Sequence, residues 1–131
     1  MKARTGLLMI AGVVLLGMTV LAHHSIIGTY DFKKEVKLDG KLVQVQLRNP
    51  HSFIQVEAPD DKGVIQRWAL EWGGAGQLVN QGVDRNSLKI GDKVLVTGNP
   101  ARNGDTRMRL TSIRRPSDGF GWGTRPGEVV D

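Results

Sequence analysis

The sequence has no cysteine and few aromatic residues, and both shortages restrict the chemistry open to it. Without thiols the chain cannot form a disulfide, a cysteine-ligated zinc site or an iron–sulfur cluster, and thiol catalysis is excluded. Aromatic residues make up 5% of the 131 residues, and three histidines are present. Glycine is abundant, at 17 residues, which favours a β protein with many turns over a helical bundle. A chain of this length is expected to form one domain.

The one long apolar run is at the amino terminus. Leu7 to Leu21 is uncharged and follows Lys2 and Arg4, which is typical of a secretory signal peptide. The run is short for a membrane-spanning helix, and Ala22 suits the position before a cleavage site. We therefore expect residues 1–22 to be a signal peptide and the mature protein to be periplasmic. The alternative is that the segment is not cleaved and anchors the protein. If it is cleaved, the chain would contact the membrane only through this segment, before cleavage.

Three parts are expected after the signal peptide. Residues 23–37 would be an extended arm, residues 38–115 the folded domain and residues 116–131 a flexible, glycine-rich tail. A turn is expected at Asp39-Gly40, a dipeptide that tolerates positive φ. The arm would pack on the domain through one of three residues: Ile27, Tyr30 or Phe32.

Alternation of apolar and polar residues marks the strands of the domain. Val43, Val45 and Leu47, for example, alternate with polar side chains, as in a strand with one wet face. Strands are predicted over residues 41–48, 53–57, 64–72, 93–98 and 106–113, with a short helix over 75–81. The predicted core comprises Trp68, Leu70, Val94, Val96, Met108 and Leu110. The order β-β-β-α-β-β predicts a mainly β fold, a small five-stranded OB-like barrel with one short helix.

Several motifs give the chain a resemblance to a known family. They are His23-His24-Ser25, Asn49-Pro50-His51, Trp68-Ala69-Leu70-Glu71, Gly91-Asp92-Lys93-Val94 and the segment Gly98 to Gly104. In this combination the chain resembles a family of small exported bacterial proteins classed as a domain of unknown function. In strand order alone it is similar to periplasmic bacterial OB-fold proteins. The resemblance implies export and a barrel, and it implies no activity.

The histidines suggest a metal site. Cleavage after Ala22 would leave His23 with a free α-amino group beside its imidazole, and His51 or His24 could add another nitrogen. Ligand sets made of nitrogen suit copper(II). Glu71 or Asp31 could serve as an oxygen ligand or could orient an imidazole. The sequence thus predicts an exported copper-binding protein, against the alternative that His23 and His24 are a frayed terminus and His51 a turn residue.

A binding module is the competing function. Arg48, Arg107 and Arg109 could hold an anionic glycan, a peptide or a protein partner outside the cytoplasm. An enzyme is not expected, because Ser25 and Ser52 adjoin histidines on strands where neighbouring side chains point to opposite faces. Nucleic-acid binding is not expected either, since the net charge of +5 is modest and few aromatics are free to stack. The protein is predicted to be a monomer.

Overall fold

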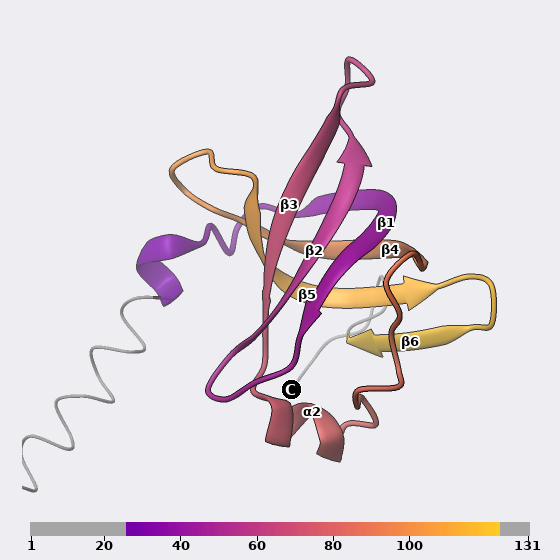
Figure 1. Cartoon of the computed structure of the whole chain (residues 1–131). Coiled ribbons are helices and arrows are strands. Elements are labelled where there is room, and N and C mark those ends of the chain that lie inside the picture. The colour runs from indigo at the N-terminus through magenta and orange to yellow at the C-terminus, as the bar shows by residue number, and fades with distance from the viewer. Residues whose placement is uncertain (1–25, 124–131) are drawn as a thin grey trace, which may run out of the picture.

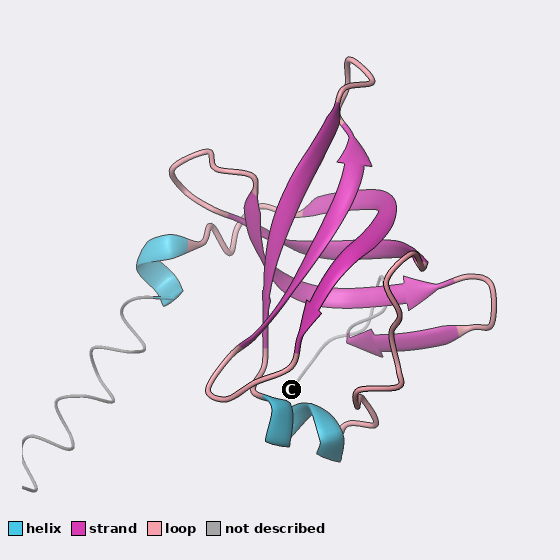
Figure 2. Cartoon of the chain, in the orientation of Figure 1, coloured by secondary structure: helices cyan, strands magenta, loops and turns pink. Residues whose placement is uncertain are grey.

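The computed structural model of the chain describes residues 26–123. The expected signal peptide, His23, His24 and the last eight residues lie outside this range. A short helix over residues 26–29 is followed by the main elements, which Figures 1 and 2 show. These are β1 (Val36–Gln46), β2 (Ser52–Pro59), β3 (Ile65–Trp72), α2 (Ala75–Asn80), β4 (Lys93–Pro100), β5 (Arg107–Arg115) and β6 (Phe120–Gly123).

The first five strands close into a barrel. Their order in the sheet is β3-β2-β1-β4-β5, and β3 also pairs with β5 in parallel, which joins the two ends. The helix α2 lies between β3 and β4 in the chain and sits at one end of the barrel (Figure 1). This confirms the predicted mainly β, OB-like barrel. No helix within residues 26–123 is long and apolar enough to cross a membrane.

Strand β1 runs through the place where a turn was predicted. Asp39 and Gly40 lie inside the strand, so the predicted turn is wrong. Residues 36–41 pair with β4 and residues 41–46 pair with β2, so β1 bends from one side of the barrel to the other. A Cβ atom at Gly40 would lie 2.4 Å from the carbonyl oxygen of Glu57. Glycine is therefore needed here for close backbone approach at the bend rather than for a turn.

The predicted tail also contains a strand. β6 pairs antiparallel with the second half of β5, and Phe120 and Trp122 pack against the core. The prediction of a flexible tail from residue 116 is therefore wrong for residues 120–123. Alternation of two aromatics with Gly121 and Gly123 was a weak signal for this strand. Pairing with β5 orders this strand, and a segment of four residues is too short to show a reliable period in its sequence.

The core fills the barrel with apolar side chains from each of the strands β1 to β5. Five of the six predicted core residues are buried, and Trp68 is only partly buried, packing on the core from its edge. Trp72, Leu78 and Val83 extend the core towards α2. Gly82, with a φ of 83°, follows the helix at a position where the left-handed conformation favours glycine.

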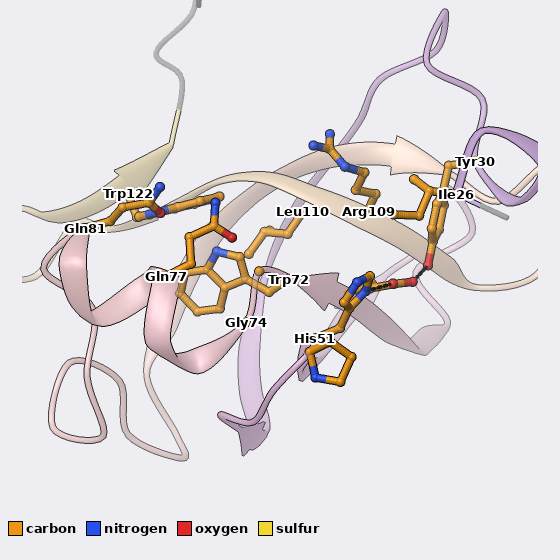
Figure 3. A pocket seen from close by; sticks show the side chains of 13 residues that line it. Ile26, Tyr30, His51, Trp72, Gly74, Gln77, Gln81, Arg109, Leu110 and Trp122 are labelled. Atoms are coloured by element: carbon orange, nitrogen blue, oxygen red, sulfur yellow. Dashed lines mark hydrogen bonds and ion pairs between the residues drawn. The ribbon is translucent and has the colours of Figure 1, made fainter. Parts of the chain in front are cut away.

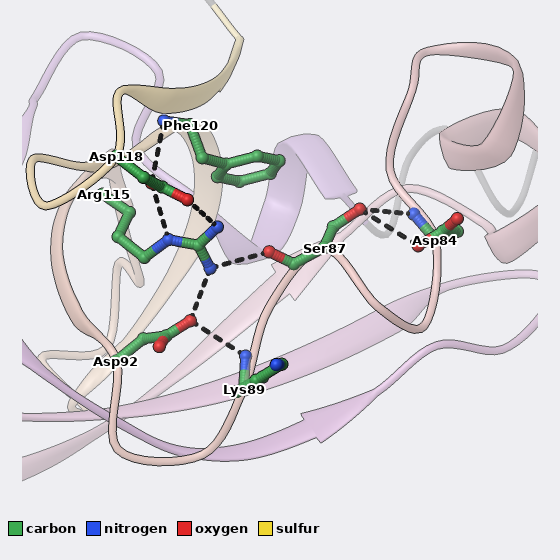
Figure 4. A network of polar contacts seen from close by, with 7 residues as sticks. All are labelled: Asp84, Ser87, Lys89, Asp92, Arg115, Asp118 and Phe120. Atoms are coloured by element: carbon green, nitrogen blue, oxygen red, sulfur yellow. Dashed lines mark hydrogen bonds and ion pairs between the residues drawn. The ribbon is translucent and has the colours of Figure 1, made fainter.

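A polar network fastens the loop before β4 to the turn between β5 and β6 (Figure 4). Arg115 donates to Asp92 Oδ2 at 2.6 Å and to the carbonyl of Ser87 at 2.8 Å. It also forms a two-pronged contact with Asp118, at 2.9 and 2.8 Å. Its guanidinium lies over the ring of Phe120, 5.1 Å from the centroid. One arginine thus holds together segments that no ladder joins.

Candidate functional site

His51 lies at the end of the loop between β1 and β2, directly before β2. The loop contains a cis peptide bond between Asn49 and Pro50. It is tied to the start of α2, where the backbone N–H of Ala75 donates to the carbonyl of Arg48 at 3.0 Å and that of Gly76 to Asn49 Oδ1 at 3.2 Å. The helix and the loop therefore fix each other, and His51 is carried on a supported backbone.

The side chain of His51 is held by Glu71 of β3. Its Nδ1 is hydrogen-bonded to Glu71 Oε1. The other carboxylate oxygen accepts a hydrogen bond from the hydroxyl of Tyr30 and lies 3.5 Å from Nη2 of Arg107. We call these four residues the Glu71 cluster. Figure 3 shows dashed lines joining His51 and Tyr30 through the carboxylate between them.

The protonation states in the cluster follow from these contacts. Burial alone would raise the pKa of Glu71, but the hydrogen bonds from Tyr30 and His51 and the charge of Arg107 outweigh it and hold this pKa below its ordinary value. Glu71 is therefore ionised and accepts only. Since Nδ1 of His51 must carry the proton of the shared hydrogen bond, Nε2 of a neutral His51 carries a free lone pair.

Tyr30 anchors the amino-terminal arm in the cluster. It is the one tyrosine of the chain, is 1% exposed and pairs with Ala101 through an isolated bridge. Burial and the bond to the carboxylate of Glu71 raise the pKa of Tyr30 well above its ordinary value, so its hydroxyl stays a donor. The sequence offered Tyr30 as one of three packing candidates, but it gave no sign that the hydroxyl reaches Glu71 across 41 residues.

A cavity of about 240 Å³ opens beside the cluster (Figure 3). His51, Glu71 and Tyr30 line one part of it, and Ile26 stands next to them. Gln77 of α2 and Gln81, directly after α2, stand on the other side. Residues of β3, β5 and β6 also line the wall: Trp72, Arg109, Leu110 and Trp122. The wall is thus partly apolar and carries several polar groups, as ligand sites do.

Two indole rings of this wall differ in their hydrogen bonding. Trp72 and Trp122 pack edge to face, with centroids 5.1 Å apart. Nε1 of Trp122 donates to Gln81 Oε1 at 2.8 Å. Nε1 of Trp72 is buried and has no hydrogen-bond partner among the described residues. Leaving a buried donor unpaired costs about 1–3 kcal/mol. Within residues 26–123 this is the one buried side-chain polar atom without a hydrogen-bond partner.

The three arginines proposed as an anion site have different surroundings. The guanidinium of Arg48 lies over the ring of Phe53, 5.2 Å from the centroid. Arg107 is already paired with the carboxylate of the Glu71 cluster. Arg109 lies over Phe32, at 5.4 Å, lines the cavity and forms no ion pair within the described part of the chain. Arg107 and Arg109 share one face of β5, and of these two only Arg109 has no ion pair within residues 26–123.

Of the residues predicted to bind a metal, His51, Glu71 and its alternative Asp31 lie within the described part of the chain. Within residues 26–123, no group of three or more His, Cys, Asp or Glu side chains could hold a metal ion. Nε2 of His51, a residue that lines the cavity, has no hydrogen-bond partner among residues 26–123, whereas both oxygens of Glu71 have partners. Glu71 thus stands as an orienting group beside His51 rather than as a ligand. The expected ligands His23 and His24 lie outside the described residues.

Fold and site together define the class: a small OB-like barrel with a histidine–carboxylate pair beside a cavity. The profile of a family described as "Family of unknown function (DUF6152)" matches residues 11–109. The chain belongs to this family, which confirms its resemblance to a family of unknown function. No curated protein and no solved structure matches the chain.

Proposed function

We propose that this is an exported copper-binding protein and that His51 is the ligand which the barrel holds in position. The observation that carries the proposal is the hydrogen bond between Nδ1 of His51 and Glu71. A metal-binding imidazole commonly donates its other ring nitrogen to a carboxylate, which sets the tautomer and raises ligand basicity. Glu71 is in turn held by Tyr30 and Arg107, so its position does not depend on the metal.

The remaining ligands of the proposed site are the α-amino group and imidazole of His23, with His24 as a further nitrogen donor. Ile26, three residues after His23, lines the same cavity as His51. Three residues span at most about 10–11 Å, so the proposal requires His51 to lie within that distance of Ile26. The ligand set would consist of nitrogen atoms only, which favours copper(II) over magnesium or calcium. Export, with cleavage after Ala22, is part of the proposal because it creates the free amine.

A copper competition titration tests the terminal chelate. The protein that begins at His23 should bind one copper ion, and the protein that keeps Ala22 in front should bind it more weakly by orders of magnitude, with the same melting temperature. His51→Ala should weaken binding by a smaller factor. Equal affinities for the two amino termini would refute the chelate, and an unchanged affinity in His51→Ala would remove His51 from the site. Native mass spectrometry of the exported protein, with and without copper or zinc, reports the cleavage site and the metal count together.

A non-catalytic module for an anionic glycan, peptide or protein partner is the second candidate. It is favoured by Arg107 and Arg109, which lie two positions apart in β5 and therefore share one face of the sheet. Replacing both by alanine should abolish retention on an anionic matrix at low salt. The melting temperature should fall only through the loss of the Arg107–Glu71 contact. Retention that survives the double replacement would eliminate this candidate.

A further inference from the structure

One edge of β3 is only partly paired within the described part of the chain. On one side, β2 pairs with all eight residues of β3. On the other side, β5 pairs only with Ala69, Leu70 and Glu71, and no strand among residues 26–123 lies against Ile65 to Trp68. In Figure 1 this half of β3 rises with β2 above the other strands. We call the unpaired side of residues 65–68 the free edge.

The backbone groups of Ile65 and Arg67 point outward from the free edge. The N–H of Ala69 donates to the carbonyl of Thr106, on the side away from β2, at 3.0 Å. Alternate residues of a strand direct their N–H and C=O groups to the same side, so those of Ile65 and Arg67 point the same way as those of Ala69. Ile65 is 59% exposed. Two donors and two acceptors in a row are therefore open to another strand.

A second copy of the same edge fits these groups. In an antiparallel pair centred on Gln66, Ile65 of each copy lies opposite Arg67 of the other, so outward-pointing groups meet outward-pointing groups. The same register sets the exposed Val64 opposite Trp68, which packs on the core and is only partly buried. The hairpin turns just before Val64, and the pairing with β5 begins just after Trp68. The free edge and the strand that it would accept thus have the same length.

The charges near the free edge also favour a second copy. Nη2 of Arg67 lies 2.6 Å from Oε1 of Glu57, so the charge at the centre of the edge is balanced within its own hairpin. The turn at residues 60–62 carries two carboxylates and one ammonium group. The antiparallel register brings this turn next to the start of β5 in the other copy, where the side chain of Arg107 is 43% exposed. Opposite charges therefore meet at both ends of the pair.

We propose that two copies of this chain pair antiparallel through residues 64–68, which joins their sheets edge to edge. A pairing this short buries less than the roughly 1,200 Å² of a stable interface, so the dissociation constant should be on the order of 0.1–1 mM. His51 lies at the other end of the hairpin of β2 and β3, so copper binding neither requires nor excludes the dimer. The sequence predicts a monomer because the pairing of β3 cannot be read from a local pattern.

Sedimentation equilibrium and ¹⁵N NMR of the full processed protein, with EDTA present, test the pairing at concentrations from about 10 μM to about 2 mM. The mass should rise from that of a monomer towards that of a dimer. The backbone amide signals of Ile65 and Arg67 should move downfield with concentration, because both N–H groups gain acceptors. Leu95, exposed on β4, is the internal control and should stay in place. A monomer at every concentration overturns the proposal, as does a dimer that leaves the signals of Ile65 and Arg67 unchanged.

Two substitutions at Arg67 separate the backbone from the side chain. Arg67→Pro removes the outward N–H, and a free edge is where a strand tolerates proline. Arg67→Ala is the matched control, because it loses the same ion pair with Glu57 and keeps the N–H. Arg67→Pro should associate at least about tenfold more weakly than Arg67→Ala, since each dimer loses two hydrogen bonds. Equal association of the two variants would overturn the backbone pairing.

Val64→Asp keeps the proposal testable if proline unfolds the hairpin. It places a carboxylate opposite Trp68 of the other copy and should also weaken association at least about tenfold. Ile90→Asp makes the same kind of change at a residue that is 72% exposed on the loop before β4, and it should leave association unchanged. Association that survives Val64→Asp, or that is lost equally in Ile90→Asp, would overturn the proposal. All these measurements are made without metal, so their outcome is independent of the copper titration.

Discussion

The carboxylate of Glu71 and the imidazole of His51 are hydrogen-bonded across 20 residues of sequence. The register between β2 and β3 explains the contact, because Phe53 pairs with Glu71 and His51 lies two residues before Phe53. Alternate residues of a strand share a face, so all three side chains leave the barrel on its outer side. The strand register thereby places the carboxylate of Glu71 next to His51 on the adjoining loop.

Glu71→Gln should weaken copper binding by about 10- to 100-fold, the usual effect of losing the group that orients a metal-binding histidine. The amide keeps the shape but no longer fixes which ring nitrogen of His51 is protonated. Competition titration gives the affinity, and ¹⁵N NMR of the histidine ring gives the tautomer. Glu57→Gln, which alters an exposed ion pair with Arg67, is the control and should change neither. A wild-type affinity in Glu71→Gln would show that the orienting contact is irrelevant to the metal.

Gly74→Ala should disturb the loop that carries His51. A Cβ atom there would lie 2.7 Å from the carbonyl oxygen of Pro50 and 2.9 Å from Asn49 Oδ1, so the loop or the helix must move. We expect a loss of about 1–3 kcal/mol in unfolding free energy, as for other overpacked sites, together with weaker copper binding. Urea denaturation and the copper titration measure the two effects.

Gly76→Ala is the matched control for that change. It lies two residues further on, inside α2, and its added Cβ atom would meet only Asn49 Oδ1, at an ordinary 3.9 Å. Alanine is the better helix former, so this variant should be stabilised by up to about 1 kcal/mol. If Gly74→Ala behaved like Gly76→Ala, the close contact between the helix and the loop would not matter.

Sequence patterns were sufficient for the barrel and insufficient for the site. Alternation is a local property, and it located the five barrel strands. The hydroxyl of Tyr30 reaches Glu71 only because the arm crosses the barrel and bridges Ala101, which no local pattern encodes. The turn predicted at Asp39-Gly40 was wrong for a related reason. Glycine serves both a turn and a close backbone approach, and only the pairing of β1 with two partners distinguishes them.

Gly40→Ala should destabilise the barrel more than any change at an open glycine. The added methyl would lie 2.4 Å from the carbonyl oxygen of Glu57 and 2.6 Å from a methyl group of Val56, both on the adjoining strand. We expect a loss of about 2 kcal/mol or more, because backbone atoms in a closed ladder cannot move aside cheaply. Gly28→Ala, with no atom within 4 Å of its added carbon, is the comparison in the same urea experiment. Equal stabilities would mean that β1 does not bend as described.

Acid should loosen the network around Arg115 as the pH falls from about 4 towards 2. The hydrogen bonds from Arg115 lower the pKa of Asp118 to about 2, and the backbone N–H of Lys89, with Arg115, lowers that of Asp92. A carboxyl group with a lowered pKa in the folded state stabilises the fold above its unfolded pKa of about 4, and this contribution is lost as the pH falls towards 2. Asp118→Asn should therefore be less stable than wild type at pH 6, and the difference should shrink between pH 4 and pH 2. In an Arg115→Gln background, Asp118→Asn should have little effect at any pH. Urea unfolding of the four proteins across this range checks the prediction, and a difference that stays constant with pH would contradict it.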